Sequence, residues 1–154
     1  MKKNGFTLVE LIIVIAVLAI LAAVLIPLMS GYVKDAADAR TLVRARTWYG
    51  AAHNELIEMY SHGTRTMSAA YKTKIRKQAN DPNCKVFVVF TKGNLDVAGA
   101  KADAYSAVGA YYKDSSGNIL WNVNGRWTKT APDKKKVTAW WYTVVGRGGN
   151  YPWE

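Results

Sequence analysis

The chain has 154 residues, room for one membrane span and a single globular domain of roughly 100 residues. Its formal net charge is +10, from 21 Lys/Arg and 11 Asp/Glu, and so basic a chain attracts polyanions, although the same charge also serves solubility. Because Cys84 is the single cysteine, a disulfide within the chain is excluded, and a lone cysteine is most often a small buried apolar residue.

An apolar stretch from Phe6 to Met29 dominates the beginning of the chain. It contains one charged residue, Glu10, and one helix-breaking residue, Pro27. At about 1.5 Å per residue these positions form a helix of roughly 36 Å, long enough to cross a hydrocarbon core of ~30 Å. A small soluble domain has no use for a helix that is apolar on every face. The stretch therefore predicts a membrane span.

Lys2 and Lys3 precede the span and predict its orientation. Positive residues stay on the cytoplasmic side, so we expect the bulk of the chain on the outside. A cleaved secretory signal is not expected, because its apolar region would be shorter, about 7–15 residues, and would end at a small-x-small site.

Glu10 is unusual because a carboxylate within a span costs about 2.5–3.5 kcal/mol on insertion scales, and less near the interface. One interpretation is that Glu10 lies in the first helical turns, where it reaches the headgroups and meets the positive end of the helix dipole. The other is a cationic partner. Cleavage between Gly5 and Phe6 would create an α-amine, which could reach the Glu10 of a neighbouring copy.

The residues around Glu10 read Lys2-Lys3-Asn4-Gly5-Phe6-Thr7-Leu8-Val9-Glu10. Followed by an apolar helix with Pro27, this motif resembles the class III signal of type IV prepilins and pseudopilins. The resemblance implies a prepilin peptidase that cuts after Gly5 and methylates Phe6. It also implies that Glu10 docks each subunit into a helical filament, built on a pilus assembly platform, and that Thr7 and Pro27 take part in assembly.

The resemblance covers about the first thirty residues, and the chain departs from the family beyond them. Many members have a cysteine pair in a C-terminal loop, whereas this chain has Cys84 alone, which favours a Gram-positive source. Pro27 predicts a gentle kink, or, by the resemblance, a part of the helix that loosens during assembly.

The helix is expected to continue past the membrane. Between Tyr32 and Tyr60 there is no proline, and Gly50 is the single glycine. Apolar residues recur at steps of three and four, the period of an α-helix: Ala39, Leu42, Ala45, Tyr49, Ala52, Leu56 and Met59. We expect this face to pack on the globular core, and the upper face of the helix to meet neighbouring copies.

The remaining pattern predicts a short helix at about 66–79 and antiparallel strands within about 85–145. The expected strands are 85–91, a hairpin of 104–113 and 118–124, a short strand at 126–128, and 137–145, with a loop or single helical turn at 92–102. This order predicts an α+β, pilin-like fold, with a long N-terminal helix packed on a small antiparallel sheet. The expected parts are a leader (1–5), a transmembrane and assembly half (6–30) and a globular domain (31–154, its helix half about 31–61).

No residue pattern indicates catalysis, a cofactor or a metal. His53 and His62 have no partner ligand at useful spacing, and Cys84 has no neighbouring histidine. The segment from Asp114 to Asn118 superficially resembles a calcium loop, but it lacks the later glutamate and reads as a hairpin turn.

Aromatic and basic residues are interleaved in the last third of the chain. Base stacking beside backbone-tracking cations is the combination that binds single-stranded nucleic acid, so these residues are candidates for polyanion binding. Cross-strand packing and subunit contacts are the alternative interpretation, with Trp140 and Tyr142 expected on one face of a strand and Trp141 on the other. The candidates are Arg126, Lys134, Lys135, Lys136, Trp140, Trp141 and Arg147.

Three functions remain open at this point. The first is a structural subunit of a type IV pilus-like filament, a single-pass cytoplasmic membrane protein before assembly and part of a cell-surface homo-oligomer afterwards. The second is a DNA-binding pilin or a pseudopilin of a DNA-uptake or type II secretion system. The third is a plain single-pass anchor with a binding domain.

Overall fold

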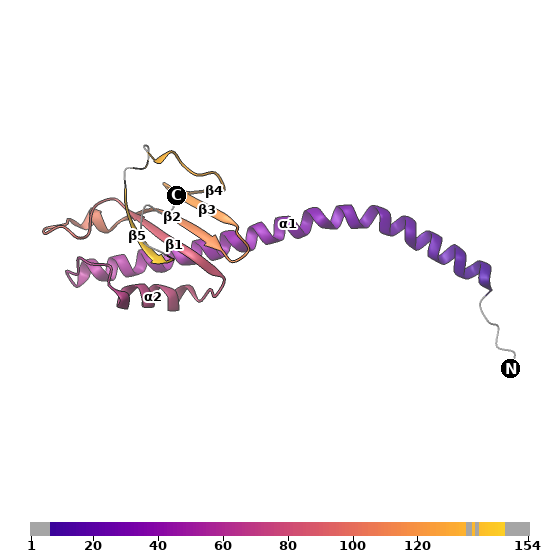
Figure 1. The fold of residues 1–154 in the computed structure, drawn as a ribbon, viewed down its shortest axis with the longest axis horizontal. Helices are drawn as coiled ribbons and strands as arrows, with labels where there is room; N and C mark the ends of the chain where they lie inside the picture. Colours follow the sequence, from indigo (N-terminus) through magenta and orange to yellow (C-terminus); the bar gives the residue numbers. More distant parts are fainter. Residues whose placement is uncertain (1–6, 135–136, 138, 147–154) are drawn as a thin grey trace. The chain divides into compact units, whose positions relative to one another are not determined.

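The computed structural model describes residues 7–134, 137 and 139–146. The chain divides into an N-terminal unit, Met1–Ala39, and a C-terminal unit, Arg40–Glu154, and helix α1 runs through the boundary. The elements in order are α1 (Leu8–Ser61), α2 (Ala69–Ala79), β1 (Cys84–Thr91), the 3-10 helix η1 (Ala102–Tyr105), β2 (Ala107–Asp114), β3 (Ile119–Val123), β4 (Arg126–Thr128) and β5 (Trp140–Val145) (Figure 1).

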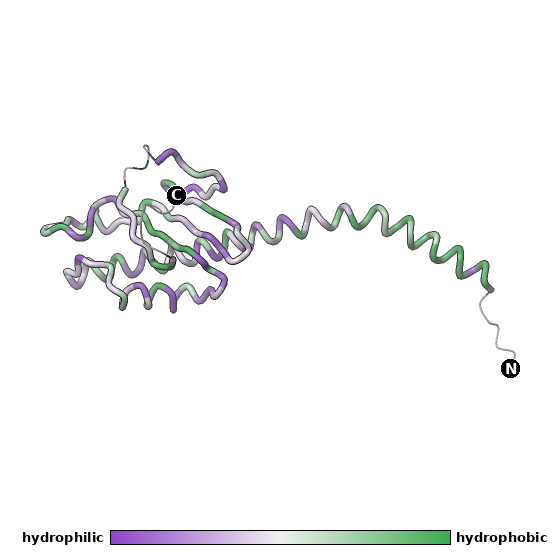
Figure 2. The backbone as a smooth tube through the Cα atoms, in the orientation of Figure 1, coloured by the Kyte–Doolittle hydropathy of each residue, from purple (hydrophilic) through white to green (hydrophobic). Residues whose placement is uncertain are grey.

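In the N-terminal unit, α1 is a continuous helix whose described side chains are almost all exposed. Hydrophobic residues cover it on every side from Leu8 to Met29, as the hydropathy colouring shows (Figure 2). Among the described residues, α1 is the one helix that is long and apolar enough to cross a membrane. The helix passes through Pro27 unbroken, and the Ser30 hydroxyl donates a hydrogen bond of 2.8 Å to the Pro27 carbonyl.

In the C-terminal unit, the part of α1 from Arg40 onward has one buried face. Its buried residues are Thr41, Ala45, Trp48, Ala51, Ala52, Glu55, Leu56 and Met59, at the expected steps of three and four. Ala39, expected on this face, is exposed, and the buried face begins two residues later, at Thr41. Thr41, Trp48, Ala51 and Glu55 were not among the residues expected there. Trp48 packs against Phe87 of β1 with 5.2 Å between ring centroids.

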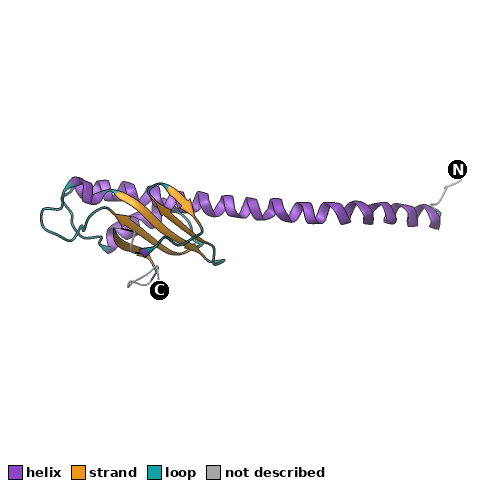
Figure 3. Cartoon of the chain, turned by 90° about the horizontal axis from the view of Figure 1, so that it is seen from above, coloured by secondary structure: helices purple, strands orange, loops and turns teal. Residues whose placement is uncertain are grey.

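The sheet has five strands in the order β4-β3-β2-β1-β5, and every neighbouring pair is antiparallel. The Arg40–Ser61 part of α1 lies against one face of this sheet (Figure 3). Side chains from that face, from α1 and from α2 form the main hydrophobic core. The predicted α+β, pilin-like fold, a long helix on a small antiparallel sheet, is therefore confirmed.

The opposite face of the sheet carries a second, smaller core. Val88, Phe90, Tyr111 and Trp121 are buried there, and the rings of Tyr111 and Trp121 meet edge-on at 4.8 Å between centroids. Residues of this core come from alternating strand positions, since neighbouring positions such as Phe87 and Val89 point into the main core. Both faces of the central strands are thus buried, which the sequence did not predict.

The hairpin between β2 and β3 ends in the predicted turn. The Asp114 carboxylate accepts hydrogen bonds from the amides of Ser116 and Asn118, both at 2.9 Å, and Gly117 has a φ of +86°. At Gly109 on β2, an added Cβ would come within 2.3 Å of the Asn122 carbonyl oxygen on β3. Glycine is the residue that this close approach permits.

Some element boundaries differ from those expected. Residues 104 and 105, predicted as strand, belong to η1, because the Ala104 and Ser106 amides bond back to the carbonyls of Lys101 and Asp103. Helix α2 begins at Ala69 rather than 66, with Ser68 as its N-cap. Strand β5 begins at Trp140, and the described residues Val137 and Ala139 precede it.

Candidate functional site

The first turn of α1 places Thr7 and Glu10 in a reciprocal arrangement. The Thr7 amide and hydroxyl both donate to Glu10 Oε2, at 2.8 and 2.7 Å, and the Glu10 amide donates to Thr7 Oγ1 at 3.3 Å. This is a capping box, in which a threonine at the N-cap and a glutamate three residues later satisfy free amides at the helix start. We did not predict it from the sequence, although the spacing Thr-x-x-Glu was its signal.

The capping box gives the Glu10 carboxylate neutral partners on its own helix. Both donors of Thr7 reach Oε2, and Oε1 receives neither of them. The structure thus places two of the four predicted assembly residues, Thr7 and Glu10, in direct contact. Pro27 lies about five turns further along α1, while Phe6, the fourth, and the predicted cleavage residue Gly5 lie outside the described residues.

The apolar side chains after Glu10 have no covering partner within the described chain. Every large hydrophobic residue from Leu8 to Met29 is at least half exposed. Soluble proteins rarely expose contiguous apolar surface of this extent, and where they do it marks a membrane or protein interface. The arrangement can therefore serve insertion into lipid, contact with other copies, or both in succession.

The candidate polyanion-binding residues are spread over the sheet. Arg126 is exposed on β4, at one edge, while Trp140 and Trp141 lie on β5, at the other. Four spacings of about 4.8 Å separate these edges, roughly 19 Å in all. Lys134 is exposed in the segment before β5, and Lys135, Lys136 and Arg147 lie outside the described residues.

The two tryptophans of β5 differ in their surroundings. Trp140 is 53% exposed, whereas Trp141 is half-buried against the second core. Tyr142 points the other way, toward the main core, where its hydroxyl accepts a hydrogen bond of 2.8 Å from the Leu95 amide. Of the two, Trp140 is the one available to a partner.

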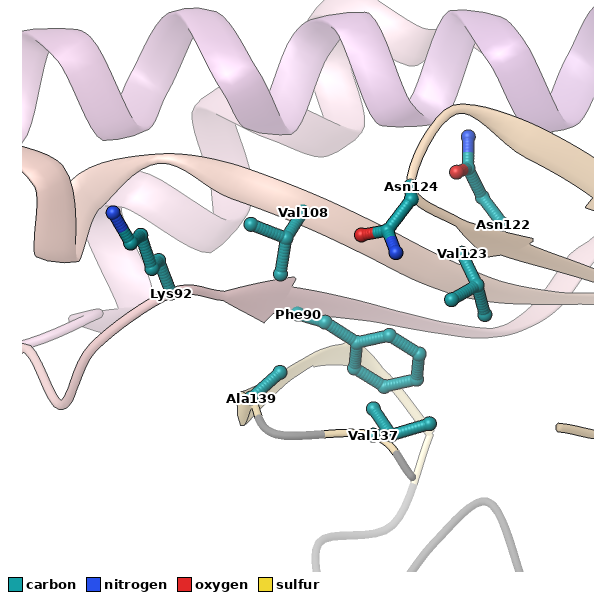
Figure 4. Close-up of a pocket in the computed structure, with 8 residues that line it drawn as sticks. All are labelled: Phe90, Lys92, Val108, Asn122, Val123, Asn124, Val137 and Ala139. Carbon is teal, nitrogen blue, oxygen red and sulfur yellow. The ribbon is translucent and has the colours of Figure 1, made fainter. Parts of the chain in front are cut away.

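A cavity of about 230 Å³ lies on the second-core side of the sheet. Figure 4 shows the Phe90 ring pointing from the sheet toward Val137. The lining of the cavity is mostly apolar, with one ammonium group and two side-chain amides, and these lining residues include no carboxylate, histidine or thiol. The lining residues are Phe90, Lys92, Val108, Asn122, Val123, Asn124, Val137 and Ala139.

The titratable residues singled out in the sequence do not form a reactive centre. His53 is exposed on α1, and His62 Nδ1 lies 2.9 Å from the Glu58 carbonyl oxygen. Burial and the nearby Asp81 carboxylate raise the pKa of the Cys84 thiol to about 12, so the thiol stays protonated and poorly nucleophilic at neutral pH. Among the described residues no cluster of His, Cys, Asp and Glu could hold a metal ion.

Asp81 joins three elements of the C-terminal unit. Its almost fully buried carboxylate accepts hydrogen bonds from Trp48 Nε1 at 3.2 Å and from the Tyr112 hydroxyl at 2.7 Å. It also accepts from the Asn83 amide at 3.0 Å, and Arg44 Nε lies 3.8 Å away. Burial and the bond to Asp81 raise the pKa of Tyr112. Asp81 therefore fastens α1 to β2 through the turn after α2.

Glu55 forms a second polar junction, between α1 and α2. Glu55 is 1% exposed, and its Oε2 accepts no hydrogen bond from any described residue. Gln78 Nε2 donates to Oε1, and Lys74 Nζ lies 3.9 Å from Oε2 while pairing with Glu58. Burial, then the neighbouring Glu58, raises the pKa of Glu55.

Residues 1–26 match the protein family described as the prokaryotic N-terminal methylation motif. The match covers the charged start, the capping box and most of the apolar stretch. Comparison with curated proteins and with solved structures finds no match to this chain.

Proposed function

Because residues 1–26 carry a class III signal of the type IV pilin and pseudopilin kind, we propose that the chain is a structural subunit of a type IV pilus-like filament. A prepilin peptidase cleaves it after Gly5 and methylates the new N-terminus at Phe6. An assembly platform then draws the subunit from the cytoplasmic membrane into a helical homo-oligomer, held together by the apolar half of α1.

The observation that carries this proposal is the match of residues 1–26 to the methylation motif. The motif and the apolar helix suit a membrane-anchored, later surface-exposed pilin, and pilin-type proteins are structural rather than enzymatic. The exposure of the apolar half of α1 supports polymerisation, since lipid covers this surface before assembly and other copies can cover it afterwards.

The capping box supports a specific role for Glu10. A carboxylate held by Thr7 through Oε2 keeps one orientation and still offers Oε1 to a cation. The α-amine of Phe6 from a neighbouring copy supplies that cation after cleavage, and the low dielectric around the apolar helices strengthens the pairing. Each new subunit is thereby registered against the last.

Mass spectrometry of the N-terminus of the native protein tests the processing step, and we expect a chain that begins with N-methylated Phe6. Electron microscopy of cells that produce Glu10→Ala tests the docking role. We expect insertion into the membrane at wild-type levels and filaments reduced at least tenfold. An intact Met1, or normal filaments from the variant, would count against the proposal.

A second candidate function is a DNA-binding pilin, or a pseudopilin of a DNA-uptake or type II secretion system. Two observations support it. Trp140 is exposed, and residues 31–154 contain 19 Lys/Arg and 10 Asp/Glu, a net excess of nine positive charges. Detergent-solubilised chain should bind oligonucleotides with an affinity that falls steeply as salt rises. Trp140→Ala should weaken that binding, and the absence of any salt-dependent binding would remove this candidate.

A further inference from the structure

One face of α1 in the C-terminal unit points away from the sheet. Val43, Gly50 and Ile57 are spaced by seven residues and therefore lie on one side of the helix, with Arg46 beside them. At 100° per residue, this side is opposite the buried residues of the same helix, such as Trp48. Val43 and Ile57 are 62% and 54% exposed. We call these four residues the Gly50 face.

Gly50 has no role that the fold of one chain explains. A Cβ at this position would meet no atom within 4 Å, and the backbone there is helical. Glycine destabilises a helix interior relative to alanine, because it loses more backbone freedom on folding. A glycine on an outward helix face is explained if a second backbone approaches closely at that point.

The positive charge of Arg46, close to Gly50, indicates the composition of the partner surface. Arg46 is exposed and forms no ion pair with another residue that the structure describes, whereas Arg44, two positions earlier, lies 3.8 Å from Asp81. A partner for this surface should therefore combine acidic residues with small and apolar ones.

The stretch 31–39 of α1 has this composition. It is almost entirely exposed, it carries two acids, Asp35 and Asp38, against one base, Lys34, and its Tyr32 and Val33 are among the large exposed hydrophobics. Its small residues, among them Ala36 and Ala39, let two helices approach closely, and helices in such contacts lie about 8–10 Å apart.

We propose that the Gly50 face binds residues 31–39 of α1 from a second copy of the chain, with Arg46 facing Asp35 of that copy. This inference rests on the proposed filament and adds a contact outside the membrane-spanning stretch. The two patches differ, so the contact is heterologous and can repeat from copy to copy without closing a ring.

Filament yield from full-length variants, by shearing, sedimentation and electron microscopy, tests the contact. Gly50→Leu should lower the yield at least tenfold, because its side chain separates the helices, and Gly50→Ala severalfold. Ala70→Leu, which places a leucine at an exposed position of α2, should assemble as wild type. Near-ultraviolet circular dichroism in detergent should show all three variants folded.

A charge exchange makes the test independent of volume. Arg46→Asp should reduce filaments severalfold, and adding Asp35→Arg should restore them, since each position then meets the opposite charge. Wild-type yield from Gly50→Leu, or no recovery in the double variant, would overturn the contact while leaving the filament proposal intact. A wild-type chain that forms no polymer would overturn both.

Discussion

Helix α1 contains two regions that differ in how exposed their apolar side chains are. From Leu8 to Met29 the hydrophobic side chains are exposed on all sides, whereas from Thr41 to Met59 most of them lie on one face that is buried against the sheet, and Val43 and Ile57 stay exposed on the opposite face. The first region needs lipid or other copies to cover it, and the second is covered by its own chain. A single helix therefore contains both an exposed apolar stretch and one side of a folded core.

Paired truncations of leucine would make this difference measurable. Leu56 is fully buried and Leu18 is 58% exposed. Leu56→Ala should lower the free energy of unfolding of the C-terminal unit by about 3 kcal/mol, because it removes buried methyl groups and leaves a cavity. Leu18→Ala should change it by less than about 0.5 kcal/mol. All six tryptophans follow Arg40, so their fluorescence reports on this unit. Equal losses in the two variants would contradict the comparison.

Removing the Asp81 carboxylate should be nearly as costly. Asp81→Ala leaves Trp48 Nε1 and the Tyr112 hydroxyl without their acceptor, and unsatisfied buried donors cost about 1–3 kcal/mol each, partly relieved by water. We expect a loss of about 2–3 kcal/mol in chemical denaturation. The exposed Asp96→Ala is the matched control and should stay near wild type. A loss below about 0.5 kcal/mol, the usual range for surface changes, would show that Asp81 does not fasten α1 to the sheet.

Replacing Glu55 should raise the free energy of unfolding rather than lower it. Burial raises the pKa of this carboxyl in the folded state, so the protonated form is favoured there, and its contribution to stability is lost as pH rises through the folded pKa. Glu55→Gln removes the buried charge and should raise the free energy of unfolding by about 1 kcal/mol at pH 7.5.

The advantage of Glu55→Gln should shrink as pH falls and vanish below the unfolded pKa of about 4.3. Thermal melts between pH 4 and pH 8 would show this trend. A variant less stable than wild type at pH 7.5 would mean instead that the attraction of Lys74 exceeds the cost of burial.

The smallest expected effect is in the first turn of α1. Thr7→Ala removes the hydroxyl of the capping box, which is worth about 1 kcal/mol at a helix end, while Thr7→Ser keeps it. Amide exchange of residues 8–11 in detergent should become severalfold faster in the alanine variant alone. Unchanged exchange would show that the capping box does not hold this turn.

The order of elements could be predicted because local patterns specify it: an apolar run, a 3.6-residue period, then alternating β-branched and aromatic residues. What was missed depends on contacts distant in sequence. Asp81 reads as a turn residue, yet its partners Trp48 and Tyr112 are 33 and 31 positions away. The second core was missed because strand alternation does not reveal whether both faces of a sheet are covered.

In the candidate site, Glu10 could be singled out from the sequence, but its contact with Thr7 was missed. Glu10 stands out in the sequence as a charge in an apolar run, and its motif points to a neighbouring copy as partner. The capping box with Thr7 lies within the same few residues. We did not predict it, because the resemblance already implied a partner for Glu10 in a neighbouring copy. The spread of Arg126 and Trp140 to opposite edges follows from strand order, which no local pattern encodes.

The half-buried Cys84 thiol determines how readily the chain can carry probes. With its pKa raised to about 12, the reactive thiolate is rarer at neutral pH than that of an exposed cysteine by roughly three orders of magnitude. A cysteine introduced on the surface should therefore capture a maleimide dye first, and fluorescent fibres can be prepared without deleting the native sulfur.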